Sequence, residues 1–145
     1  MTKLTIHYDL QKDIWNRYEA CHSVYQWINR KQWIDWKIHQ TIISKDQDEA
    51  ELYLSWYIKD NHQVHINHYL LQLDNDSILR ESENYLKRLE REIWYKVPFS
   101  TIKLFVTSFP RCTYDSINWS LMCYYKTSQP IHAVLHETLH FIFHH

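Results

Sequence analysis

Residues 136–145 read His136-Glu137-Thr138-Leu139-His140-Phe141-Ile142-Phe143-His144-His145, and the run around them has the apolar spacing of a helix. On a helix, positions i and i+4 lie on one face a turn apart, so the imidazoles of His136 and His140 can reach one metal ion at roughly 2.0–2.1 Å. The Glu137 carboxylate lies beside them, on the side where a water on the metal would lie. The stretch therefore predicts a helix that carries a metal site, and the rest of the fold is expected to support it.

The pattern His-Glu-x-x-His, with uncharged residues on both sides, resembles the active-site helix of the zincin metallopeptidases. The similarity covers residues 134–142. It implies that His136 and His140 bind Zn²⁺, that Glu137 is the general base that takes a proton from water, and that the substrate is a peptide or protein. The same motif, followed by three apolar residues and another His, also resembles the ImmA/IrrE-type regulatory peptidases, although the Gly that is usual inside their motif is absent.

A catalytic zinc ion needs a third protein ligand besides water, and the sequence does not identify one. His132 and His144 extend the four-residue spacing, but each lies about 12 Å of helix rise from the far member of the pair, too far to share one ion. Three explanations stay open: the chain is a fragment of a longer protein, the ligand lies upstream, or the site is degenerate. The upstream residues with suitable atoms are Asp115, Cys112, Cys123, His65 and His68.

Other interpretations of these upstream residues need no metal. Cys112 and Cys123 have no diagnostic spacing and are expected to be small buried residues. His62, His65 and His68 are expected at the surface or in strand pairing. None of these residues, and not Asp115 either, is therefore assigned to the metal site from the sequence.

Length, charge and cysteine count limit the classes of function. A chain of 145 residues has the size of one domain, expected to span 1–145, and its net charge of −1 gives no basic excess for nucleic acid or an anionic membrane. Three cysteines, an odd number, and an N-terminus without a signal-peptide core favour a reducing, cytoplasmic setting. No apolar run approaches the roughly 20 residues that cross a bilayer, so we expect a soluble protein.

The chain contains no glycine, while it has 7 Trp and 11 Tyr. Tight turns and helix ends must therefore use Asn, Asp, Pro or a strained residue. The aromatic side chains are expected to pack in the core with their polar tips at the surface.

Hydrophobic periodicity predicts two long helices. Residues 2–8 alternate as a short strand, after which Asp9 can cap a first helix whose apolar stripe begins at Ile14 and continues to about Lys31. The second helix is expected to begin at Asn75-Asp76-Ser77 and to end by Lys96. Its expected core face consists of Leu79, Leu86, Leu89 and Ile93.

The remaining segments predict a small sheet. Residues 52–58 and 64–70 alternate like strands around a turn at 59–61, although a helix stays open for either. Residues 102–107 and 117–126 alternate more clearly and predict two strands of one sheet. Residues 127–130 then offer a cap and a first-turn proline for the motif helix.

The predicted fold is α+β and zincin-like, with two long helices and a small, mostly antiparallel sheet before a C-terminal metal-site helix. The strand at 117–126 is expected at or near the sheet edge that borders the cleft, because zincins bind an extended substrate along such an edge. The expected function is zinc-dependent peptide hydrolysis. The alternative is a non-catalytic protein-interaction module with a degenerate zincin site, and single-stranded nucleic-acid binding is disfavoured by the lack of basic excess.

Overall fold

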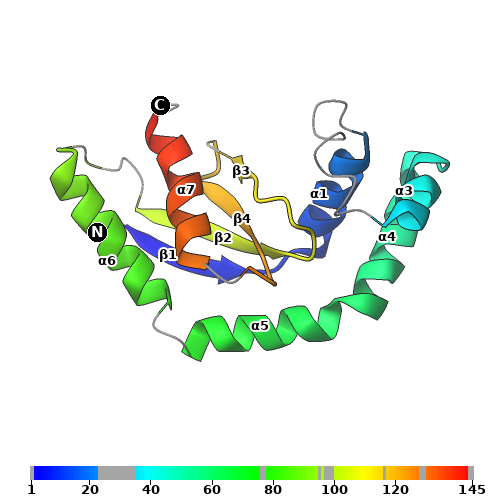
Figure 1. The fold of residues 1–145 in the computed structure, drawn as a ribbon, viewed down its shortest axis with the longest axis horizontal. Coiled ribbons are helices and arrows are strands. Elements are labelled where there is room, and N and C mark those ends of the chain that lie inside the picture. Colours follow the sequence, from blue (N-terminus) through cyan, green and yellow to red (C-terminus); the bar gives the residue numbers. More distant parts are fainter. Residues whose placement is uncertain are drawn as a thin grey trace.

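The computed structural model describes residues 2–22, 35–75, 78–94, 96, 100–115, 117–127 and 130–143. Helices and strands are combined in this part of the chain, which confirms the α+β class (Figure 1). The elements are β1 (Lys3–His7), α1 (Leu10–His22), α3 (Trp36–Ile43), α4 (Gln47–Asn61), α5 (Gln63–Asn75), α6 (Ile78–Glu92), β2 (Thr101–Thr107), β3 (Tyr114–Asp115), β4 (Ser120–Tyr124) and α7 (Pro130–Phe143).

The strands form one sheet in the order β1-β2-β4-β3. Strands β1, β2 and β4 are parallel, and only the two-residue β3 is antiparallel, against β4. The expectation of a mostly antiparallel sheet is therefore wrong. The chain returns to the same end of the sheet before β2, through helices α1 to α6, and before β4, through the segment that contains β3, so neither pair is a hairpin.

The two edges of the sheet differ. In β1, the Lys3 N–H donates to Ser100 O beside β2, so the next N–H, that of Leu4, points outward from the edge. Leu4 N donates to Glu83 Oε1 of α6 at 3.0 Å. Helix α6 therefore covers the β1 edge, whereas β3 forms the other edge.

Residues 52–58 are helical, so their interpretation as a strand is wrong. Ala50, Leu54 and Ile58 are fully buried, at the four-residue spacing of one helix face. Leu52 and Trp56, which gave the segment its alternation, are 73% and 59% exposed. The alternation of large apolar residues predicted a strand here because it included Leu52 and Trp56, which are not part of the core.

The same holds for residues 64–70, which lie in α5, and the turn expected at 59–61 is the last turn of α4. Helix α4 has its own start, since Asp46 caps it by accepting from Glu49 N at 2.9 Å. Ile66 is buried in α5, while Val64 is 77% exposed. The helical alternative that the sequence left open is the correct one for both segments.

Helix α1 begins as predicted. Asp9 Oδ1 accepts from Gln11 N at 2.9 Å, and Ile14 and Cys21 are buried. Its expected continuation to Lys31 lies outside the described residues, which stop at the end of α1 and resume at residue 35.

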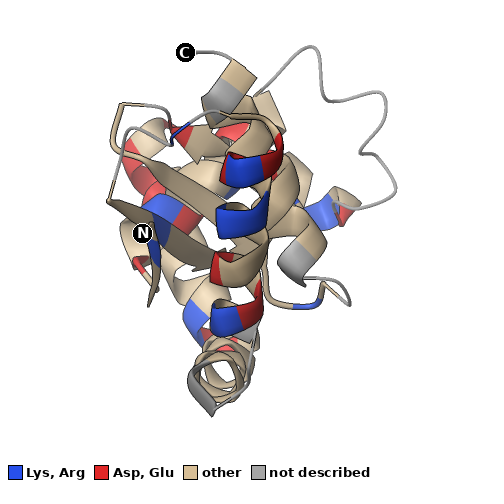
Figure 2. Ribbon diagram, turned by 90° about the vertical axis from the view of Figure 1, so that its left-hand side faces the viewer, with Lys and Arg blue, Asp and Glu red and all other residues tan. Residues whose placement is uncertain are grey.

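Helix α6 confirms the second long helix in part. Leu86 is buried and the helix ends at Glu92, within the expected limit of Lys96, but Ile93 is 40% exposed. Of the expected start signal, Asn75 belongs to α5, and residues 76–77 lie outside the described part. Figure 2 shows acidic and basic residues interspersed on the side of the molecule that α6 occupies.

Two cores pack against the sheet. Helices α6 and α7 lie on one face, and Figure 1 shows α7 in front of the strands while α6, α5 and α4 follow one another around them. The core on this face consists of Leu4, Leu86, Ile102, Leu104, Leu121, Cys123, Val134 and Phe141. The second core joins α1, α3, α4 and α5 to the carboxyl end of β2; its members include Ile14, Ile42, Leu54, Ile58, Ile66, Leu73, Val106 and Phe109.

Two tryptophans occupy positions that favour glycine. Trp94, just after α6, has φ 54°, and Trp119, just before β4, has φ 49°. Left-handed backbone is costly for a residue with a Cβ, so these turns confirm the strain expected of a chain without glycine. None of the described helices is long and apolar enough to cross a membrane.

Strand β4 is shorter than the predicted segment 117–126. The Asp115 carboxylate accepts from Ile117 N at 2.9 Å and from Asn118 N at 3.2 Å. This local side-chain turn competes with the strand and delays β4 to Ser120. β4 pairs with β2 on one side and with the edge strand β3 on the other, which places it near the sheet edge as expected.

Candidate metal centre

Helix α7 is held on the sheet by one buried face. Val134 and Phe141, seven residues apart, are each 1% exposed and belong to the core between the sheet and α6. Thr138 is buried between them and donates its hydroxyl to Val134 O at 2.7 Å. This packing fixes the rotation of α7, with Tyr114 of β3 beside its His140.

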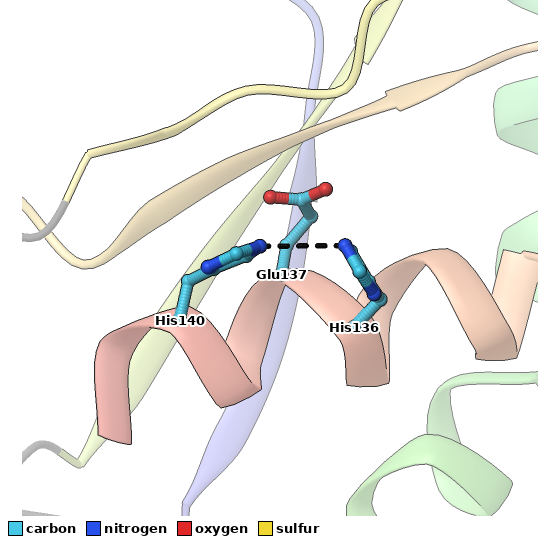
Figure 3. Close-up of side chains that lie close together, drawn as sticks. All are labelled: His136, Glu137 and His140. Atoms are coloured by element: carbon cyan, nitrogen blue, oxygen red, sulfur yellow. Dashed lines mark hydrogen bonds between the residues drawn. The ribbon is translucent and has the colours of Figure 1, made fainter. Parts of the chain in front are cut away.

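The predicted pair His136 and His140 comes together on α7 (Figure 3). Their Nε2 atoms are 3.3 Å apart, and the ring centroids are 4.9 Å apart. Two nitrogens that bind one tetrahedral zinc ion at about 2.0–2.1 Å are separated by about 3.3–3.4 Å. The two imidazoles therefore already have the spacing of two zinc ligands.

Glu137 completes the group. Ligand atoms of the three side chains lie within 4.8 Å of one another, and Figure 3 shows the Glu137 carboxylate on the same side of α7 as the facing rings. The side chain is only 7% exposed. Burial raises the pKa of the Glu137 carboxyl, and the charge of His136 offsets part of this rise.

Strand β3 supports the group through an aromatic residue that the sequence did not indicate. The Tyr114 ring stacks on the His140 ring with a centroid distance of 4.7 Å and an interplanar angle of 3°. It also contacts Phe141 edge-to-face at 5.8 Å. Tyr114 thereby restricts the orientation of the His140 ring. A two-residue strand has no periodicity, so the sequence offered no pattern that could reveal this contact.

The other proposed ligands do not join the group, which is the only cluster of the described residues that could hold a metal ion. Asp115 is engaged in its turn, where the hydrogen bond from Asn118 lowers the pKa of the carboxyl. Cys123 is fully buried, and burial raises the pKa of its thiol to about 12.

The remaining histidines are also elsewhere. His65 and His68 are exposed on α5, and His132 is exposed on α7. His144 lies outside the described residues. Within the described ranges, the third ligand of a complete zinc sphere is not identified.

A pocket of about 560 Å³ lies next to β3. Phe105 and Met122, which line it, are register partners, and strand alternation places them on the sheet face opposite the one that α7 covers. Tyr114 lines the same pocket, as do Lys12 and Trp15 of α1. The β3 edge thus has the group of His136, Glu137 and His140 on one side and a largely apolar pocket on the other.

No protein-family model, curated protein or solved structure matches this chain.

Proposed function

We propose that the chain is a zinc-dependent peptidase that uses His136 and His140 as metal ligands and Glu137 as general base. The observation that carries the proposal is the 3.3 Å separation of the two Nε2 atoms beside a buried carboxylate. Zinc, when bound, supplies Lewis-acid polarisation of a carbonyl and a lowered pKa of water.

Each residue of the group has a distinct part in this proposal. His136 and His140 bind through the Nε2 lone pairs, which requires both rings to be neutral with the proton on Nδ1. Glu137 accepts the proton of the attacking water on a carboxylate oxygen and can return it to the leaving amine. Tyr114, stacked on His140, is a positioning residue.

The open edge of the sheet supports an extended peptide as the substrate. Because α6 covers β1, β3 is the edge at which a peptide can add a strand, and it lies beside the metal-binding group. Side chains of an extended peptide alternate between the two faces of a sheet. Alternate residues of the substrate would then face α7 and the 560 Å³ pocket.

Metal content of the purified protein tests the proposal. We expect wild-type protein to bind about one zinc per chain in equilibrium dialysis against excess zinc and His136→Ala or His140→Ala to lose this binding, since one imidazole alone holds zinc still more weakly than two. His132→Ala is the matched control, because His132 is exposed on the same helix and outside the group. Absence of zinc from the wild type, or zinc retained by both variants, would contradict the proposal.

The alternative function, a protein-interaction module with a degenerate zincin site, has an observation of its own. Leu52 and Trp56 lie one turn apart on α4 and are 73% and 59% exposed, and neighbouring exposed apolar side chains can form part of a protein-binding surface. Peptidase assays on zinc-loaded protein separate the two candidates. Full zinc occupancy without cleavage of any peptide in a diverse library would favour the module.

A further inference from the structure

Arg17 is a buried cation on the face of α1 that packs against the end of β2. Its side chain is 8% exposed. Nε donates to Ser108 Oγ at 3.0 Å, and Nη2 donates to Ser108 O at 2.8 Å and to His62 Nε2 at 3.1 Å. These contacts use three of the five N–H groups of the guanidinium.

The charge of Arg17 has no anionic partner in the described structure, where no carboxylate comes within 4.0 Å of the guanidinium. Asp13, one turn earlier on α1, is engaged by Thr107 Oγ1 at 2.6 Å and Ser108 N at 2.9 Å. The rings of Tyr57 and Phe109 lie 5.2 Å and 5.3 Å from the guanidinium carbon, which offsets only part of the cost of burial. A buried arginine without a counter-ion within contact distance is costly, and the planar guanidinium is well suited to bind a carboxylate or phosphate that would supply the missing charge.

Arg17 also lines a pocket of about 360 Å³, together with His62, Ser108, Tyr57 and Tyr124. The Nη1 atom of Arg17 has no hydrogen-bond partner among the described residues. It is also not fully buried, so it remains accessible to a ligand. The pocket lies at the carboxyl end of β2 and β4, where parallel sheets commonly bind ligands. The volume exceeds that of a single water many times.

His62 also lines the pocket, and its hydrogen bonds determine which ring nitrogen carries the proton. Because arginine can only donate, His62 Nε2 must accept from Arg17, so the ring proton is on Nδ1 and is donated to Tyr125 Oη at 3.0 Å. Protonation of Nε2 would break the bond to Arg17 and place two cations together. Burial lowers the pKa of His62 to about 4, and the charges of Arg17, Lys126 and His65 contribute.

One carboxylate faces the pocket. Asp35 lines it, but its side chain is exposed and caps α3 by accepting from Lys37 N at 2.8 Å. It is thus held at the rim by its own helix, whereas Arg17 is the buried charge. The site is expected to be selective for an anion that reaches Arg17.

We propose that this pocket, here called the Arg17 pocket, binds a small organic oxyanion, a carboxylate or phosphate monoester carried on an apolar or aromatic body. The anionic group lies against Arg17 and His62, and the body lies against the aromatic rings of Tyr57 and Phe109. This site is separate from His136 and His140 and does not depend on zinc.

Calorimetric titration of the full chain with five probes tests the proposal. We expect benzoate or phenyl phosphate to bind at least tenfold more tightly than acetate or inorganic phosphate, because the small ions lack the apolar body. Benzamide, which has the ring and no charge, should not bind measurably. The ranking of benzoate against phenyl phosphate identifies which oxyanion the pocket prefers. Absence of binding by both aromatic anions, or equal binding of benzamide, would overturn the proposal.

Two further measurements locate the binding. Arg17→Met should weaken benzoate or phenyl phosphate binding at least tenfold, while Arg88→Met, a change at an exposed arginine of α6, should leave it unaltered. In wild-type protein, NMR titration should show the pKa of His62 rising by at least one unit when the anion is bound, because the anion compensates the imidazolium. An unchanged pKa of His62 would refute the assigned location even if Arg17→Met fails to fold.

Discussion

Glu137 is the residue on which the proposed chemistry depends, and its replacement by Gln keeps the shape while it removes the proton acceptor. We expect Glu137→Gln to retain zinc and to lose peptidase activity by about 10²–10⁴-fold, the usual range for a general base. Glu137 is buried, but Gln has the same shape and Glu137 is not a ligand in this proposal. The free energy of unfolding should therefore change little.

Zinc content, steady-state hydrolysis of a peptide and urea unfolding should be measured on the same preparations of wild type and Glu137→Gln. Comparison at equal zinc occupancy is essential, since a site with two histidines holds zinc weakly. Undiminished hydrolysis by Glu137→Gln would show that another group accepts the proton.

His62 makes stability depend on pH independently of the metal site. Its pKa is about 4 in the folded chain and about 6.5 in the unfolded chain, so the unfolded state binds more protons between these values. The neutral His62 ring therefore makes its full contribution to the free energy of unfolding above pH 6.5, and this contribution is lost as the pH falls toward 4. We expect a loss on the order of 1–2 kcal/mol once solvent screening of the half-exposed ring is considered.

Urea unfolding at pH 7 and at pH 4.5 measures this effect, with His62→Gln to isolate the residue, because the amide can replace both hydrogen bonds. His65→Gln is the matched control, since His65 is exposed on the next turn. An equal pH dependence in wild type and His62→Gln would contradict the assigned protonation state.

The two polar sites differ in how far the sequence could predict them. His136, Glu137 and His140 are neighbours on one helix, so their proximity follows from helix geometry alone. Arg17 and His62 are 45 positions apart and meet only because α1 packs on α4. No local pattern encodes such a contact, and the sequence accordingly suggested a surface role for His62.

Among the elements, the turns without glycine lend themselves to a direct test. Trp94 is 95% exposed with φ 54°, so Trp94→Gly should remove backbone strain without loss of packing. We expect the free energy of unfolding to increase by about 0.5–1 kcal/mol. This is the strain removed from the folded state, less the extra conformational entropy that glycine gives the unfolded state. Equilibrium denaturation in urea measures it.

Trp119→Gly is the informative counterpart. Trp119 has φ 49°, but its ring packs edge-to-face on Phe141 at 5.6 Å. Relief of strain should be outweighed by lost packing, with a net destabilisation of about 2 kcal/mol. Destabilisation of the same size in Trp94→Gly would show that its turn is not strained.

Helices and strands were predicted well where the apolar residues of a segment follow a single helical or strand spacing. β1, β2, α1, α6 and α7 each place apolar residues on one face, and each exists close to its predicted position. Helices α4 and α5 carry exposed apolar residues such as Leu52 and Val64, which disguised the helical spacing of the buried set. The apolar pattern reports burial only when few large apolar residues are exposed.

For the whole molecule, the direction of the strands could not be predicted from their patterns. Strand alternation is the same in parallel and antiparallel sheets, and direction depends on where the chain crosses between strands. The connection between β2 and β4 contains a two-residue strand that no periodicity reveals. Only the structure reveals β3, and β3 forms the open edge at which the proposed peptide substrate would bind.

The pairing of β1 with β2 also has a consequence for biosynthesis. Lys3 pairs with Thr101, so on a ribosome the first strand emerges long before its partner exists. Loop closure over that length slows folding, and β1 has unpaired backbone groups on both sides until α6 and β2 have followed. Nascent chains arrested before residue 101 should therefore depend on chaperones, and this dependence should end only when α7 has emerged and covered the core face of the sheet. The motif helix, which follows β4, can dock only on a sheet that is already complete.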